Sequence, residues 1–434
     1  MRKLYLFFAA VAILAVAGCQ KNTPGDENVP GYNEKEDPNR PSGNDDVSVS
    51  PEQYIQETAK ALMDELNYSN WSSEAEFIHK VIVALQNKDF SDETLKNWSK
   101  ALTDAWTMEP RREGNATIYE TYIRISDAKG HFEEQPDGSF TKTDADDFQM
   151  TVLVDGEKVT STLVYSDSKV PVRVSRRHFE NYNYDTDEYS FEYFDTYVYV
   201  PSIAELKILR GSAEFARLNL NMSADIKDPT EVNPYTDSAT IDAVLKIGVY
   251  TLSLQNVAYS PQGASARLKL LSGQSSLITV DANGIYELDP ASREAIPIKS
   301  GAVDASVDIM GRIQVKGNVP DFVKFYGTMN SMKDKSNDGL AYKALVGELE
   351  KTFSAAMYFN GSSTPRATLG LDAVQYNTGS GYWTCNPVLN FSDGTSYTVQ
   401  EYFSEEKFGD TISYAKSWYN GIVSYVSNLF SDIR

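Results

Sequence analysis

The sequence predicts an α+β protein that is mainly β, with a long antiparallel meander sheet and helices packed on it. Residues 216–226 and 303–315 place apolar side chains at every second position, which is the period of a strand with one covered face. Turn residues recur between such stretches without crossover helices, which favours antiparallel hairpins. Apolar residues at helical spacing predict helices near both ends of the folded body.

Residues 1–18 are typical of a signal peptide. Arg2 and Lys3 precede the apolar run Leu4–Ala17, which is shorter than the ~20 residues that a membrane-spanning helix requires. The following Val16-Ala17-Gly18-Cys19 resembles the lipobox of bacterial lipoproteins. This resemblance implies that Cys19 is acylated, becomes the first residue of the mature chain and holds the protein to the membrane.

Residues 19–50 are expected to be the lipidated cysteine and a disordered acidic linker. The segment 20–50 contains four prolines, seven acidic residues and little apolar surface, so it cannot offset the entropy of ordering. As a random coil it would span about 30 Å. It resembles the polar, acidic segments that follow the cysteine in surface-exposed lipoproteins of Bacteroidota, and a merely solvated linker is the alternative.

The net charge limits the classes of partner that the protein can bind, and the cysteine content limits disulfide formation. The chain has a net charge of −21, and loss of Arg2 and Lys3 with the signal gives −23 for the mature protein, so nucleic acid is not an expected partner. Of the two cysteines, Cys19 serves the anchor, and Cys385 therefore has no intramolecular partner. Cys385 shares a predicted strand face with Trp383 and Phe391. This position indicates that the Cys385 side chain is a small buried apolar group and not a nucleophile.

Residues 51–110 are expected to form a module of three amphipathic helices. The second should start at a capping box of Ser73 and Glu76, and the third should run from Ser91 to Trp106. Residues 111–210 are expected to form an antiparallel β region, with hairpin turns at Asp137-Gly138 and Asp155-Gly156.

Residues 211–434 are expected to form a long-strand meander with helices, either separate from 111–210 or continuous with it. The alternation in 303–315 predicts one strand, about 45 Å long, with Gly311 inside it. Asn283-Gly284 and Asp393-Gly394 are predicted turns. Helices are predicted from Pro320, from a cap at 337–338, and from 410 to the C-terminus.

The segment 182–200 contains the candidate binding surface. In a strand, four aromatic residues would share one face: Phe191, Tyr193, Tyr197 and Tyr199. Aromatic rings can cover apolar sugar faces while neighbouring carboxylates accept hydroxyl hydrogen bonds, so these residues are candidate glycan contacts. The alternative is that tyrosine favours strands and that this face covers a neighbouring sheet.

The sequence contains no signature of catalysis. His79, His131 and His178 lack zinc-ligand spacing, and the acidic group Asp144–Asp147 lacks the features of an EF-hand. No nucleophile elbow, phosphate-binding loop or dinucleotide fingerprint occurs, so neither an enzyme nor a cofactor is expected. The 61 acidic residues allow many carboxylate pairs, and their sequence spacing singles out none.

The signal, the lipobox, the acidic linker and the closing motif Asn390–Thr395 resemble the outer-membrane and surface lipoproteins of gut-type Bacteroidota. This resemblance implies a lipid-anchored envelope protein, periplasmic or surface-exposed, and carries over no active-site residue. Two functions stay open. One is a non-catalytic binding or adhesion module for a glycan or a surface protein. The other is a periplasmic-type carrier that shelters a lipid or another apolar ligand against the sheet, for which a helix-lined apolar cavity would be the distinguishing feature.

Overall fold

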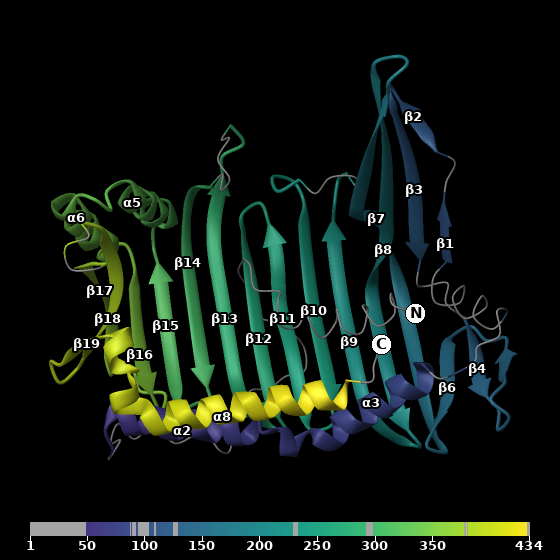
Figure 1. Cartoon of the computed structure of the whole chain (residues 1–434), viewed down its shortest axis with the longest axis horizontal. Coiled ribbons are helices and arrows are strands. Elements are labelled where there is room, and N and C mark those ends of the chain that lie inside the picture. The colour runs from purple at the N-terminus through teal and green to yellow at the C-terminus, as the bar shows by residue number, and fades with distance from the viewer. Residues whose placement is uncertain are drawn as a thin grey trace. The chain divides into compact units, whose positions relative to one another are not determined.

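The computed structural model describes residues 49–86, 88, 93, 104–107, 110–124, 129–228, 233–291, 298–376, 379 and 381–431, with 104–107, 167–170 and 200 described by backbone alone. The lipobox and residues 20–48 therefore lie outside the described residues. The chain divides into two compact units (Figure 1). Unit 1 contains Val249–Asn428 and the described residues up to Ser72, and unit 2 contains Ser73–Gly248 and the described residues after Asn428.

Unit 1 is built on an antiparallel sheet. Its strands are β11 (Tyr250–Ser260), β12 (Gly263–Ser272), β13 (Ser275–Leu288), β14 (Ile298–Ile309), β15 (Ile313–Val319), β16 (Ser354–Phe359), β17 (Ala367–Gln375), β18 (Trp383–Phe391) and β19 (Ser396–Thr398). Each strand pairs with the next one along the chain. The predicted fold class and the predicted meander are confirmed here.

The predicted single strand over 303–315 is wrong, because this stretch is a hairpin. Met310, Gly311 and Arg312 form the loop between β14 and β15, and Met310 and Gly311 have positive φ angles of 56° and 66°. This three-residue loop brings Ile309 opposite Ile313, four positions later in the chain, so both lie on the same sheet face and the alternation continues through the loop unchanged. The prediction of which residues form the apolar face is correct, and the predicted strand length is wrong. The predicted turn at Asn283-Gly284 is also wrong, since both residues pair within β13 and β14.

Helices α2 (Pro51–Glu65) and α8 (Glu405–Leu429) lie side by side across one end of the apolar face (Figure 1). The Gln56 side chain donates to the Lys407 carbonyl at 2.8 Å. Beneath them, Phe359 and Met357 join Phe408 in a buried cluster. The short elements η1 (Tyr68–Asn70) and α7 (Val399–Tyr402) flank these helices. None of the helices in the described part of the chain combines the length and apolarity needed to span a bilayer.

Unit 2 contains α3 (Ser72–Gln86) and a sheet with two very long strands. Its strands are β1 (Asp104–Thr107), β2 (Arg111–Glu113), β3 (Ala116–Arg124), β4 (Gly130–Glu134), β5 (Phe140–Thr143), β6 (Phe148–Val154), β7 (Glu157–Asn183), β8 (Glu188–Arg210), β9 (Ala213–Asp225) and β10 (Ser238–Ile247). The early part of β8 pairs with β3 and its later part with β9. Phe77 of α3 packs on Val152 and Val159 of the sheet in a separate core.

Three expectations for this part of the chain need correction. Trp106 lies in β1, which pairs with β3, so the predicted third helix does not extend to it. The helices α2 and α3 belong to different units and form no module of their own. The strand pairs β3–β8 and β4–β6 are parallel, although no crossover helix was recognised in the sequence. Neither pair joins consecutive strands of the chain, so hairpin signals between neighbouring strands cannot predict their pairing.

Candidate functional site: an apolar cavity beneath α5 and α6

Two further helices, α5 (Phe322–Asp334) and α6 (Gly339–Glu350), cover the opposite end of the apolar face of unit 1. The carboxylates of Asp321 and Asp338 cap them by accepting hydrogen bonds from backbone N–H groups at 2.9 and 3.1 Å. The cap at Asp338 was predicted. Both helices are amphipathic, and Met332 and Leu349 are buried where the helices meet the sheet.

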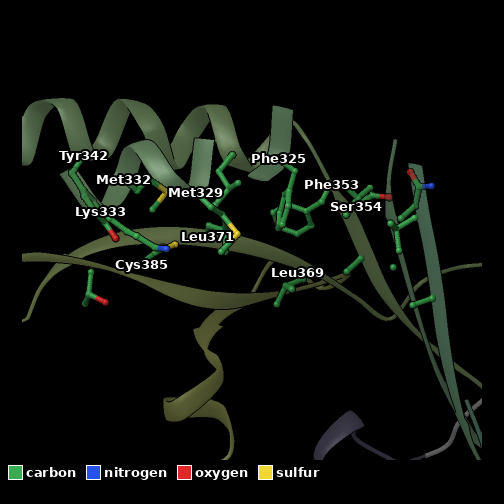
Figure 2. Close-up of a pocket in the computed structure, with 18 of the residues that line it drawn as sticks. Phe325, Met329, Met332, Lys333, Tyr342, Phe353, Ser354, Leu369, Leu371 and Cys385 are labelled. Atoms are coloured by element: carbon green, nitrogen blue, oxygen red, sulfur yellow. The ribbon is translucent and has the colours of Figure 1, made fainter. Parts of the chain in front are cut away.

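A cavity of about 650 Å³ lies between these helices and strands β14–β18. This volume is in the range of pockets that bind small molecules. Phe325, Met329 and Met332 point from α5 toward Leu371 and Cys385 of the sheet (Figure 2). The remaining apolar lining comprises Val303, Ala305, Val319, Tyr342, Leu349, Phe353, Ala355, Leu369 and Trp383.

The sheet itself explains why this space is not filled. Ala305, Gly317 and Ala355 are register neighbours on β14, β15 and β16, so a row of very small side chains forms part of the cavity floor. Strands β16 and β17 then separate after two register pairs. Beyond that point the Leu371 N–H donates to the Glu350 carboxylate at 3.2 Å, and not to β16. Small floor residues and a local opening of the sheet together leave room that α5 and α6 do not occupy.

The polar groups of the cavity lie among Asn318, Lys333, Ser336, Ser354 and Thr384. Of the lining residues, Lys333 alone is charged. It is exposed, and its amine donates to the neutral Asn330 side chain at 3.3 Å. At the same end of the cavity, the Lys343 amine lies 4.6 Å from the centroid of the Trp383 ring. The cavity is therefore an apolar space with a cationic end.

The Cys385 thiol and the Tyr342 hydroxyl, which line the cavity, stay neutral at physiological pH. Burial raises the pKa of the Cys385 thiol, and nearby Asp372 and Glu350 raise it further. Burial also raises the pKa of Tyr342. A thiol in this environment is a poor nucleophile, which agrees with the apolar role expected for Cys385. The arrangement suits binding of an apolar molecule and offers no activated group for covalent chemistry.

The predicted glycan contacts form one face of β8: Phe191, Tyr193, Tyr197 and Tyr199. Tyr197 is only 2% exposed, and its ring stacks on Tyr122 of β3 with centroids 4.9 Å apart. The Tyr199 hydroxyl accepts a hydrogen bond from Arg124 at 3.0 Å. Tyr197 is thus unavailable to a ligand, because the Tyr122 ring of the neighbouring strand stacks on it. This contact comes from a strand of the same sheet, whereas the alternative interpretation expected a neighbouring sheet.

A buried ion pair lies in the middle of the same β8 face. The side chain of Asp195 is fully buried and accepts two hydrogen bonds from Arg176, at 2.7 and 2.6 Å. The Arg176 guanidinium also lies 5.0 Å from the centroid of the Tyr193 ring. This carboxylate already has a strong bidentate partner, so it is not free to accept sugar hydroxyls. The rings and charges of this face mainly hold β3, β7 and β8 together.

The most exposed aromatic rings of this segment flank the turn at the tip of the β7–β8 hairpin. Figure 1 shows the backbone of this hairpin. Tyr184 is 89% exposed and Tyr189 is 55% exposed. Tyr182 contacts both rings, with centroids 4.8 Å apart in each case. The sequence predicts one strand over 182–200, but a hairpin turn at 184–187 separates β7 from β8. Recognising that turn would have identified the exposed rings.

The three histidines have separate surroundings. His131 contacts the Asp147 carboxylate at 2.7 Å, and this hydrogen bond lowers the pKa of Asp147. His79 packs edge-on against Phe430, and His178 lies near Tyr193. Among the residues that the structure describes, no group of three His, Cys, Asp or Glu side chains is arranged to hold a metal ion. No family model, curated protein or solved structure matches the chain.

Proposed function

We propose that this protein is a lipid-anchored envelope protein that binds an apolar molecule, with an acyl chain as the simplest form, in the cavity beneath α5 and α6. One observation carries the proposal: a space of about 650 Å³ with a predominantly apolar lining beneath α5 and α6. Of the two functions left open by the sequence, the carrier is the one that requires this feature. The cationic end and the apolar interior fit an amphiphile better than a sugar.

Chain-length dependence provides a direct test. Each buried methylene is worth about 0.8 kcal/mol, so affinity should rise about fourfold per methylene until the cavity is full. The mature chain carrying Cys19→Ala, which has no covalent acyl group, can be titrated with the neutral dye N-phenyl-1-naphthylamine. Methyl esters of increasing chain length should then displace the dye with increasing affinity and reach a plateau. No dye binding, or equal displacement by all esters, would contradict the proposal.

A glycan-binding surface is the second candidate, supported by the exposed rings of Tyr182, Tyr184 and Tyr189. Single sites of this kind are weak, and many tethered copies on one cell would make them effective. The test is a glycan array with the full mature chain and with a Tyr184→Ala, Tyr189→Ala double variant. Loss of binding in the double variant would support the surface, with Tyr376→Ala, an exposed tyrosine of unit 1, as control. Equal or absent binding in all three proteins would eliminate this candidate.

A further inference from the structure

We infer that the cavity ligand is an anionic, single-chain amphiphile whose acid group binds the amine of Lys333. This inference rests on the proposed function and adds the chemical class of the ligand. It also gives the ligand a direction, with its head near Lys333 and its tail over β14 and β15.

The shape of the cavity floor favours a long, narrow ligand. Its lining residues come from five neighbouring strands, from Trp383 and Cys385 on β18 to Val303 and Ala305 on β14. Neighbouring strands are about 4.8 Å apart, so four such steps give a floor about 19 Å long. A volume of about 650 Å³ spread over that length accommodates an extended chain more readily than a compact ring system.

The floor changes in character along this direction. Bulky Trp383 and Leu371 line the β17–β18 part, whereas Ala305, Gly317 and Ala355 line the part over β14–β16. Gly317 has no Cβ, and a methyl group placed there would approach no other atom closer than 3.8 Å. The part with small residues lies farthest from the cationic end and suits the tail of the ligand.

The charge distribution identifies the head group. The chain has 61 acidic and 40 basic residues, and many of its described lysines contact carboxylates. Lys333 is one of the smaller group of described lysines without an ion pair, and of that group it is the one that lines the cavity. Its amine is bonded to the uncharged Asn330 amide. A cation at the edge of an apolar cavity attracts an acid group, and the partly excluded water strengthens that contact.

The helix dipole favours a basic residue at the C-terminal end of α5, but it does not require that residue to line the cavity as Lys333 does. A basic residue in the last turn of α5 is favourable next to the negative end of the helix dipole. Lys335, the C-cap residue of α5, meets that requirement as well but does not line the cavity. Lys335 is therefore a matched control, since it has the same charge and lies two residues away at the same helix end.

The test compares an acid with its ester. Laurate and methyl laurate share a chain and differ in the charge of the head group. Their affinities are measured at pH 8 by dye displacement from the mature chain carrying Cys19→Ala. Laurate should bind about tenfold more tightly than the ester, as a charge-assisted hydrogen bond predicts. In Lys333→Met this ratio should fall to about one with the ester affinity unchanged, whereas Lys335→Met should retain the tenfold ratio.

Each other outcome has a distinct meaning. Equal binding of acid and ester by the unsubstituted chain would overturn the anionic head group and leave the apolar cavity supported. A tenfold ratio that persists in Lys333→Met would overturn the role of Lys333. If neither compound displaces the dye, the proposed function itself fails. Lys333 is exposed, so its replacement should not affect folding, and unchanged ester binding by the variant verifies this directly.

Discussion

A substitution that fills the cavity from its floor should weaken ligand binding without lowering the free energy of unfolding. Ala355 lies on β16 in the row of small residues, and Ala355→Phe would place a ring in the empty space. Burying a phenylalanine side chain is worth about 1.5–3 kcal/mol. A ligand that loses the same wall area should bind about 10- to 150-fold more weakly. Cavity filling of this kind commonly raises the free energy of unfolding by about 0.5–2 kcal/mol, so the variant should bind poorly although it is at least as stable.

The assay measures both quantities on the same protein. Dye displacement gives the affinity, and thermal unfolding gives the stability, with a shift of about 2–4 °C for each kcal/mol in a unit of this size. The control is Ala356→Phe, because Ala356 is the next residue, points to the opposite sheet face and pairs with Lys316 and Thr368. Ala356→Phe should leave the affinity unchanged. Normal binding by Ala355→Phe, or an equal loss in both variants, would refute the reasoning.

Three further predictions concern other parts of the chain. Cys19→Ala should move the protein out of the membrane fraction, and full recovery with membranes would rule out the lipid anchor. Asp195→Asn should lower the free energy of unfolding of unit 2 by about 3 kcal/mol. This is the lower end of the cost of breaking a buried ion pair, because the Arg176 side chain is 38% exposed and can be rehydrated. A loss below about 0.5 kcal/mol would show that the pair contributes little. Burial raises the pKa of Cys385, so its thiolate fraction at pH 8 is smaller than that of an ordinary cysteine. Alkylation should therefore reach half its maximal rate at a higher pH in the folded chain than in the unfolded chain, and coincident pH profiles would contradict this.

The sequence predicted well which residues lie on each face of the sheet, because side chains alternate between the two faces of a strand. Asp304 and Asp308 lie on the polar face of the sheet and Val303 on the apolar face, as the alternation required. Turns were identified where glycine follows aspartate, as at Asp393-Gly394, whose Gly394 has a φ of 88°. The sequence did not predict the turn at Met310-Gly311, because the three-residue loop 310–312 places Ile309 and Ile313 four positions apart, and the alternation continues through it.

The cavity could not be located from the sequence, although a sheltered apolar ligand was one of the functions left open. Its lining joins α5, α6 and five strands, and the space depends on where β16 and β17 separate. No local pattern encodes that separation. The candidate glycan face illustrates the same limit, since the periodicity placed Tyr197 on the correct side of β8 but could not show that β3 would cover it.

Protection of Cys385 by a bound ligand tests the central claim most directly. With Cys19→Ala, Cys385 is the one thiol in the mature chain, and it lines the cavity. Its alkylation rate therefore reports access to the cavity without a competing dye. The account predicts that saturating laurate slows alkylation at least tenfold in the folded protein and leaves the rate in the unfolded chain unchanged. An unchanged rate in the folded protein at a laurate concentration that displaces the dye would mean that the ligand binds elsewhere, and it would contradict the account.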